Sequence, residues 1–284
     1  TYVQVNGEDF GKVVEKQLVT YGDQWKGVSL DDGQTSLYSP EKAKASFAKA
    51  KAELQKQGVQ FPIHIDYVVD QSSSSLVQQA DSMKSSIETA LGKDNVVIDV
   101  QKLSTDDADN ATYFAQSADQ KDFDLDITGW GPDFQDPSTY LDILNPTDGS
   151  TLTGMGLDPK KDQALIEKVG LNQYKELLDA ANAEKLDTNA RYEKYAAAQA
   201  WLTENAIVLP IYSKGGVPSI TKVTPFSGAR SSIGIKGDSN FYKYQKLQDK
   251  TVTTADYEKA YKNWLKEKEE SNKKAQEELA KHVK

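Results

Sequence analysis

The sequence predicts an α/β fold in which helices cross over between parallel strands. The first observation is the order helix–strand–helix–strand–helix–strand between Ser39 and Ile127. This order is typical of α/β layers, because two parallel strands need a long crossover connection. The second observation is the composition: 38% of the 284 residues are hydrophobic, which is enough to bury a sizeable core.

The first predicted helix begins at Ser39. Ser39-Pro40-Glu41 combines an N-cap residue, a proline at the first helical position and an acid in the first turn. Gly58 stands where the C-terminus of this helix is expected. Between these ends, apolar residues recur at helical spacing: Ala43, Phe47, Ala50 and Leu54.

Two strands and a second helix follow. Ile63–Val69 alternates and then becomes fully apolar, which predicts a strand with His64 on its polar, exposed face. An apolar stripe over Leu76–Leu91, closed by Gly92, predicts the second helix. Val96–Val100 predicts the second strand.

A third helix is predicted from Thr105 to Gln116, and a third strand from Phe123 to Ile127, where apolar residues alternate with aspartates. A long stretch rich in Gly, Pro, Asp and Ser then runs over Thr128–Leu157. Loops of this length inside compact domains are usually functional or disordered, so we expect an irregular segment there.

The remainder of the chain is predicted to be mainly helical. Helical patterns resume at Asp158 and continue to Asn205 with a break near Gly170. The apolar run Ala206–Tyr212 predicts an edge strand, because it contains a proline. From Thr251 the pattern predicts an amphipathic helix that continues as a solvated tail rich in Lys and Glu.

The composition excludes several kinds of chemistry. The chain has no cysteine, so it has no disulfide, no thiol nucleophile and no Cys-ligated metal. With only His64 and His282, a multi-histidine metal site or a Ser-His-Asp triad is not expected, and we predict no cofactor. No apolar run approaches the ~20 residues that span a bilayer. The start Thr1–Gln4 carries no initiator Met and no signal pattern, which suggests a mature or excised segment.

The chain is acidic, with a formal net charge of −9. Its only arginines are Arg191 and Arg230, and nucleic-acid-binding proteins rely on arginine forks and basic patches, so we predict no nucleic-acid partner. Between Thr105 and Asp142 there are 10 aspartates and one lysine, Lys121. This stretch is either a solvated acidic face or an environment that favours cations, including the ammonium groups of ligands.

The loop after the third predicted strand is the first place to look for a ligand, because open α/β sheets bind ligands beyond the carboxyl ends of their strands. Gly129 and Gly131 flank Trp130 and permit unusual backbone angles there. Two possibilities stay open: aromatic residues of the loop line a pocket and its acids meet a cation, or Trp130 plugs the core and the acids cap turns. The side chains concerned are Trp130, Phe134, Tyr140, Asp133 and Asp136.

Two other interpretations of these acids are weaker. The spacing Asp122-x-Asp124-x-Asp126 resembles the start of a calcium-binding loop, but Ile127 stands where that loop needs glycine and Asp133 where it needs glutamate. Paired carboxylates also serve glycoside hydrolysis, but no specific motif here supports that reaction.

The segment Gly129–Pro137 resembles the Gly-Trp-x-x-Asp-aromatic-x-x-Pro motif of the extracellular solute-binding proteins of family 5, the peptide-binding subunits of ABC importers. The likeness covers most of Tyr38–Tyr212 and is greatest to the streptococcal Ami/Ali-type oligopeptide-binding lipoproteins, which also end in a Lys/Glu-rich helix. It is also carried by Tyr38–Ala43, which resembles the family's Pro-x-Lys-Ala helix, and by a late helix and Pro-aromatic strand at Arg191, Tyr195, Gln199 and Ala206–Tyr212.

The resemblance implies a type II periplasmic-binding-protein-like fold, in which two hinged α/β lobes enclose an extended peptide. In that family the Asp of the motif receives the α-ammonium group of the peptide and the Trp borders a side-chain pocket. These roles fall to Asp133 and Trp130 here. The other site residues implied by the motif are Phe134, Tyr140, Gly129 and Gly131.

Intact family members are longer than this chain, so the resemblance implies a C-terminal lobe with a mixed sheet flanked by helices. The implied division is an inter-lobe entry segment at 1–37, an α/β lobe at 38–212, a return or hinge segment at 213–250 and a helical tail at 251–284. Intact members also carry a signal peptide and a lipidated cysteine. The parent protein is therefore expected to be a lipid-anchored monomer on the extracellular face of a Gram-positive cell membrane.

The leading functional hypothesis is a binding module without enzymatic activity, which captures oligopeptides and delivers them to the permease of an ABC importer. The isolated chain is then expected to bind peptides weakly, because half of the cleft is absent. Two alternatives from other classes stay open on the residues themselves. One is a hydrolase that acts on peptides or glycans through the Asp cluster, and the other is a surface adhesin that uses the tail Tyr257–Lys284.

Overall fold

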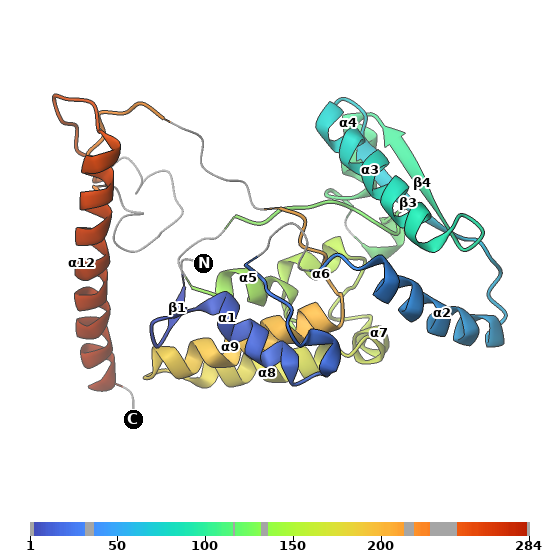
Figure 1. Ribbon diagram of the computed structural model, residues 1–284, viewed down its shortest axis with the longest axis horizontal. Helices are drawn as coiled ribbons and strands as arrows, with labels where there is room; N and C mark the ends of the chain where they lie inside the picture. Colours follow the sequence, from blue (N-terminus) through green and yellow to red (C-terminus); the bar gives the residue numbers. More distant parts are fainter. Residues whose placement is uncertain are drawn as a thin grey trace. The chain divides into compact units, whose positions relative to one another are not determined.

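The computed structural model describes residues 3–31, 37–115, 117–131, 136–212, 219–227 and 243–282 (Figure 1). The chain divides into two compact units. One passage between them falls inside the motif, between Gly129 and Trp130. Unit 1 consists of Thr1–Gly27, Trp130–Asp142 and Gln173–Lys284, and unit 2 of Val28–Gly129 and Ile143–Asn172. The four segments predicted from the sequence stay predictions.

The sheet of unit 2 is a parallel pair of strands. β3 (Ile63–Asp70) pairs with β4 (Val96–Leu103), with Ile63 opposite Val96 and Asp70 opposite Leu103. α3 (Ser74–Leu91) connects the two strands and packs against both, as the crossover of a parallel pair must. Both predicted strands and the helix between them are confirmed.

The predicted third strand, Phe123–Ile127, is wrong apart from one parallel bridge between Leu125 and Tyr67. Asp124 accounts for this short pairing. Its carboxylate accepts the backbone N–H of Asp66 at 2.9 Å, and the carbonyl of Asp66 accepts the N–H groups of Asp124 and Leu125 at 3.0 and 2.9 Å. A side chain therefore takes the place of a ladder hydrogen bond, as short polar side chains often do.

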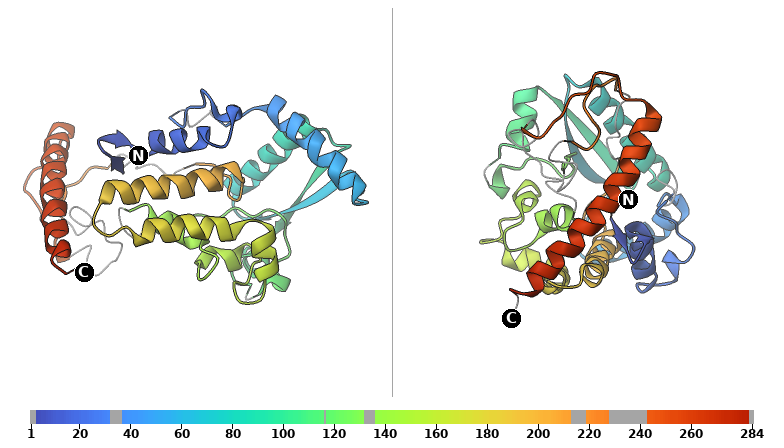
Figure 2. Two further views of the ribbon diagram at one scale, coloured as in Figure 1. Left: turned by 90° about the horizontal axis from the view of Figure 1, so that it is seen from below. Right: turned by 90° about the vertical axis from the view of Figure 1, so that its left-hand side faces the viewer.

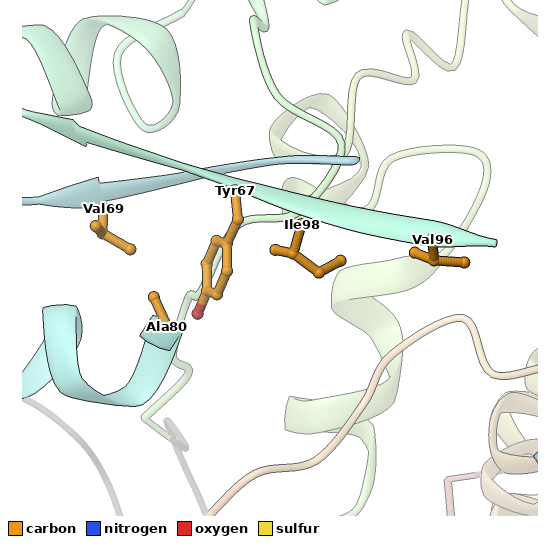
Figure 3. Close-up of a cluster of buried hydrophobic side chains, with 5 residues drawn as sticks. All are labelled: Tyr67, Val69, Ala80, Val96 and Ile98. Carbon is orange, nitrogen blue, oxygen red and sulfur yellow. The ribbon is translucent and has the colours of Figure 1, made fainter. Parts of the chain in front are cut away.

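The core of unit 2 lies between the sheet and α3. Tyr67, Val69, Val96 and Ile98 point to the side of the sheet that carries Ala80 of α3, and each is at most 3% exposed (Figure 3). Alternate residues of a strand share one face, which is why the period-two pattern predicts this core. The partly buried side chains around it are Phe47, Ile65, Val77, Met83, Ile87, Leu91, Val100 and Leu125.

The first helix is confirmed as α2 (Pro40–Lys56). The hydroxyl of Ser39 accepts the backbone N–H of Lys42 at 3.3 Å, so Ser39 is the predicted N-cap. At the other end, Gly58 has a φ of +83°, a left-handed conformation that glycine adopts without strain.

The third helix, α4 (Thr105–Ala111), ends well before the predicted Gln116. Thr112 follows its last residue, and the Thr112 hydroxyl donates to the carbonyl of Ala108 at 2.7 Å. The Thr112 N–H donates to the same carbonyl at 3.1 Å, and the backbone of Thr112 then leaves the helical conformation, at φ −121° and ψ −86°.

Short helices complete unit 2. α6 (Ser150–Gly154) and α7 (Gln163–Lys168) each bury one aliphatic side chain fully, Leu152 and Ile166. The segment Thr128–Leu157 is therefore only partly irregular, in contrast to the prediction.

Unit 1 begins with a hairpin that the sequence pattern does not predict. β1 (Gln4–Val5) and β2 (Glu8–Asp9) pair antiparallel across Asn6 and Gly7, whose φ angles are +52° and +82°. Positive φ at both positions is what a two-residue hairpin turn of type I′ requires. α1 (Phe10–Val19) follows directly.

The helical pattern predicted up to Asn205 is confirmed by α8 (Leu171–Ala183) and α9 (Thr188–Glu204), with Gly170 before them at a φ of +80°. α1 runs alongside α9 and contacts it (Figures 1 and 2). The interior of unit 1 combines aliphatic side chains, such as Leu18 and Leu178, with aromatic ones. The rings of Tyr174 and Trp201 lie 5.6 Å apart, and Tyr195 is fully buried.

The predicted strand Ala206–Tyr212 is wrong. Ala206 has a φ of +50°, and the residues after it are irregular, with no paired strand in the described part of the chain. Leu209 and Tyr212 are 67% and 58% exposed. An apolar run becomes a strand only when a neighbouring strand satisfies its backbone groups, and Pro210 has no N–H to offer.

The predicted C-terminal helix is confirmed as α12 (Thr254–Ala280). Thr253 and Asp256 form a reciprocal capping box at its start. Phe226 stacks on Trp264 of this helix with a ring separation of 5.2 Å. Within the described ranges, no helix has the length and apolar character needed to cross a membrane.

Candidate functional site

The predicted site loop leaves the sheet of unit 2 after Leu125. Gly129, Trp130 and Gly131 are exposed, and Trp130 retains 40% of its surface. A Cβ atom added at Gly129 would meet no atom within 4 Å, so the backbone there borders open space. The exposure of Trp130 argues against the alternative in which it plugs the core. The side-chain pocket itself stays a prediction.

Asp133 and Phe134 lie outside the residues that the structure describes, so their roles also stay predictions. The described chain resumes at Asp136 and enters α5 (Ser138–Leu141). Tyr140 is 38% exposed, whereas its neighbours on α5 are buried.

The site loop leaves from the carboxyl edge of the sheet. β3 and β4 end there at Asp70 and Leu103, and the segment of Leu125 runs parallel to them. Asp70 accepts hydrogen bonds from the backbone N–H of Ser72 at 2.8 Å and the hydroxyl of Thr105 at 3.0 Å. The hydrogen bonds, first that of the Ser72 N–H, lower the pKa of the Asp70 carboxyl group. This is the edge at which α/β sheets bind ligands.

Asp126, just before the loop, carries an unusual carboxyl group. Although much of the residue surface reaches solvent, the protein around the carboxyl group desolvates it and raises its pKa to about 6. The N–H of Ile127 and the charge of Lys121 oppose this shift. Desolvation favours the neutral form of an acid, which explains the direction.

Asp136, near the end of the motif, is held by the helix α9 of unit 1. The guanidinium of Arg191, on α9, bonds both carboxylate oxygens of Asp136, with Nη2 to Oδ1 at 3.0 Å. The side chains are 25% and 16% exposed, respectively. Oδ1 also accepts the backbone N–H and the hydroxyl of Ser138, at 3.0 and 2.7 Å. Asp136 therefore both meets a cation, which is a residue of this chain, and accepts the first backbone N–H of α5.

Further contacts extend from Arg191 into unit 1. Its Nη2 donates to the hydroxyl of Tyr195 at 3.1 Å, and the Tyr195 hydroxyl donates to Asn182 on α8. Burial lowers the pKa of Arg191, but the hydrogen bonds and the charges of Asp136 and Tyr195 together outweigh it, so the net shift is upward. At the end of α5, Tyr174 donates to the carbonyl of Leu141 at 2.7 Å.

Asn182 and Tyr174 are site-supporting residues that the sequence pattern does not identify, because they lie far from the motif in sequence. Among these residues, Arg191 is the one that the sequence could have indicated. The chain has only two arginines, and a buried acid needs a cationic partner.

The described residues of the loop and of α5 present an exposed indole at Trp130 and an exposed phenol at Tyr140, and Asp136 is already paired with Arg191. In the part of the chain that the structure describes, no group of three or more His, Cys, Asp or Glu is placed to hold a metal ion.

A comparison with known protein families then decides the family. The family described as "Bacterial extracellular solute-binding proteins, family 5 Middle" matches residues 10–151, which is half of the chain. The chain belongs to this family. The resemblance predicted from the motif is confirmed.

Several curated proteins match the whole chain. It is 55% identical over 288 residues to the oligopeptide-binding protein AliA of Streptococcus pneumoniae and 54% identical to SarA of Streptococcus gordonii. It is 50% identical to AmiA of Streptococcus pneumoniae. All of this chain is covered, but only 44%, 43% and 43% of those relatives, so it spans less than half of their length.

The family 5 fold is also seen in a solved structure. The substrate-binding domain of an oligopeptide ABC transporter from Bacillus anthracis superposes with a TM-score of 0.54 at 20% identity, over 87% of this chain and 39% of that one. At this identity the likeness concerns the fold alone. The predicted α/β class and its oligopeptide-binding-protein fold are confirmed.

Proposed function

We propose that this chain captures oligopeptides outside the cell and, as part of a longer binding protein, delivers them to an ABC importer. The observation that carries the proposal is the identity of 50–55% to oligopeptide-binding proteins over the whole chain. Relatives named as binding proteins also favour a receptor without enzymatic activity.

Within the site, we propose that Asp133 binds the α-ammonium group of the peptide and Trp130 lines a side-chain pocket. Phe134 and Tyr140 are the proposed walls, and Gly129 and Gly131 allow peptide backbone to approach. The exposure of Trp130 and Tyr140 supports this assignment. The pairing of Asp136 with Arg191 supports it as well, because it leaves Asp133 as the acid of the motif for a ligand.

The physical chemistry suits a ligand of variable sequence. A peptide of any sequence presents the same main chain and the same terminal charge, so main-chain hydrogen bonds and one charge clamp hold it without selecting side chains. A carboxylate–ammonium pair that is shielded from water is a strong, charge-assisted hydrogen bond. Roomy aromatic walls then tolerate different side chains.

The proposed partners and place follow from the same role. The ligand is an oligopeptide, and the membrane partner is the permease of the importer, which recognises the closed form after hinge motion of the lobes. The longer protein is proposed to be a monomer at the extracellular face of the membrane, held by a lipid anchor outside this chain.

The test is a titration of the isotope-labelled chain with a mixed pool of short peptides, followed by NMR. We expect weak binding, because the chain spans less than half of its relatives, with the indole signal of Trp130 among those that shift. Asp133→Asn should weaken binding about 10- to 100-fold, the loss of one charge-assisted hydrogen bond. The matched control is Asp122→Asn, which removes one exposed aspartate of the same acidic stretch.

Two further arms make this test decisive. N-acetylated peptides lack the ammonium group, so they should bind the wild type and Asp133→Asn equally. Mass spectrometry of the peptides after incubation distinguishes the hydrolase alternative: cleaved products that disappear in Asp133→Ala would replace the receptor hypothesis. Unchanged affinity of free peptides for Asp133→Asn would remove Asp133 from the site.

A further inference from the structure

The contact between Arg191 and Asp136 joins two residues 55 positions apart in the chain. One lies on the long helix α9 and the other at the end of the binding motif. The contact is bidentate and largely shielded, with side-chain exposures of 25% and 16%. Such a pair fixes direction as well as distance, because the planar fork of arginine matches the two carboxylate oxygens.

We infer that Arg191 is a positioning residue of the peptide site: through Asp136 it fixes α5 and thereby the orientation in which Tyr140 is presented. The inference rests on the proposed function and adds a residue that does not itself touch the peptide.

The helix α5 is too short to be stable by itself. It has four residues, and isolated helices of that length are unstable in water. Its start depends on Asp136, whose Oδ1 accepts both the N–H and the hydroxyl of Ser138. Arg191 in turn fixes the carboxylate plane that makes both hydrogen bonds possible.

α5 is tied at both ends to the helices α8 and α9 of the same unit. At its far end the carbonyl of Leu141 accepts the hydroxyl of the fully buried Tyr174 at 2.7 Å. Ser138, Thr139 and Leu141 are buried, whereas Tyr140 between them is 38% exposed. With both ends fixed, the direction of the Tyr140 side chain is set by the anchors and not by local flexibility.

Arg191 also supplies the positive charge that the shielded carboxylate of Asp136 needs. Without Arg191, the carboxylate of Asp136 would stay mostly shielded from water without its cation, which is costly. The expected response is a rearrangement that turns Asp136 towards solvent and releases the start of α5. A lysine at position 191 keeps the charge but loses the fork and the simultaneous bond to Tyr195.

The experiment uses the full chain labelled with fluorinated tyrosine, in which Tyr140→Phe identifies the Tyr140 signal. Arg191→Lys should shift or broaden that signal and weaken peptide binding about tenfold, the equivalent of one ordinary hydrogen bond. The matched control is Lys194→Ala, which breaks an ion pair of the same helix, Lys194 with Glu184 at 3.1 Å. It should leave both readouts as in the wild type.

The outcomes are distinguishable. A lower melting temperature with an unchanged Tyr140 signal and unchanged affinity would mean that the pair is only structural, and the inference fails. If Arg191→Lys does not fold, Asp136→Asn replaces it, because the amide oxygen can still cap Ser138 while the charge is lost. If the wild type binds no peptide, the proposed function fails, and the Tyr140 signal alone still decides whether Arg191 positions α5.

Discussion

At the scale of single residues, two aspartates of one acidic stretch behave differently. Asp136 has a cationic partner and two hydrogen-bond donors, so its charge serves to hold α5 in place. The carboxyl group of Asp126 is desolvated, which raises its pKa to about 6 against the opposing effects of the Ile127 N–H and the charge of Lys121. The difference arises from what lies beside each carboxylate in space, because both occur in similar sequence surroundings.

The raised pKa of Asp126 predicts a dependence of stability on pH. In the unfolded chain its pKa is about 3.9, so between about pH 4 and pH 6 the folded state binds a proton that the unfolded state has released. The contribution of Asp126 to stability therefore falls as the pH rises through this window. We expect Asp126→Asn to be more stable than the wild type at pH 7, with the gain shrinking near pH 4.

Urea unfolding at both pH values measures this difference. Asp122→Asn is the matched control, since it removes one exposed negative charge nearby. A gain for Asp126→Asn that is the same at pH 4 and pH 7 would exclude the titration of Asp126 as its cause.

At the scale of elements, α3 protects an edge of β4. In the described sheet β4 has one neighbour, β3. On the other edge, the N–H of Ile98 donates to Glu88 at 3.1 Å, and the carbonyl of Ile98 accepts from Lys84. Lys84 and Glu88 are themselves paired at 2.7 Å, one turn apart on α3. Unpaired strand edges invite association with other chains, and this clamp satisfies the edge at Ile98 and ties the helix to the sheet.

Because of Glu88, the stability of unit 2 should decrease in acid. The hydrogen bond from Lys84 is the main cause of its lowered pKa, with burial opposing. An acid with a lowered pKa stabilises the fold above its unfolded pKa, and this contribution is lost as the pH falls through the folded value. We expect Glu88→Gln to lower the melting temperature at pH 7 and to approach the wild type below about pH 4.

Thermal unfolding monitored by circular dichroism checks this prediction. The control is Asp81→Asn, which breaks the exposed pair with Lys102 at 3.1 Å and should change little. An equal loss for Glu88→Gln at pH 7 and pH 3 would show that packing, and not charge, makes Glu88 important.

At the scale of the whole molecule, the chain exposes an apolar segment, Ala206–Tyr212, for which the sequence pattern wrongly predicts a strand. Val208, Leu209, Ile211 and Tyr212 are 46%, 67%, 48% and 58% exposed. Large exposed apolar patches often mark interaction sites, and these four exposed side chains all fall within residues 208–212. The chain also spans less than half the length of its curated relatives.

We expect this segment to be the main binding site for a hydrophobic dye. Leu209→Ser with Ile211→Ser should reduce the fluorescence of anilinonaphthalene sulfonate without lowering the melting temperature, because neither side chain is part of the buried core. Ile220→Ser, at 92% exposure outside this segment, is the control. A drop in melting temperature for the double variant would show that the segment is packed in solution.

Much of the local structure could be predicted, because it depends on signals that lie next to each other in the chain. Ser39 and Gly58 mark the ends of α2, and alternation marks β3 and its inward face. The motif Gly129–Pro137 identified the family, which the match over residues 10–151 bears out. The proposed peptide contacts of Asp133 and Phe134 stay predictions.

The sequence by itself determined the alternating α/β elements, the family and the location of the candidate loop. Only the tertiary structure decided that Phe123–Ile127 makes a single bridge, that Ala206–Tyr212 has no strand partner among the described residues, and that Asp136 pairs with Arg191. The physical reason is the range of the interactions. Caps and periodicity act within a few residues, whereas strand pairing and the choice of an ion-pair partner depend on groups that folding brings together from distant parts of the chain.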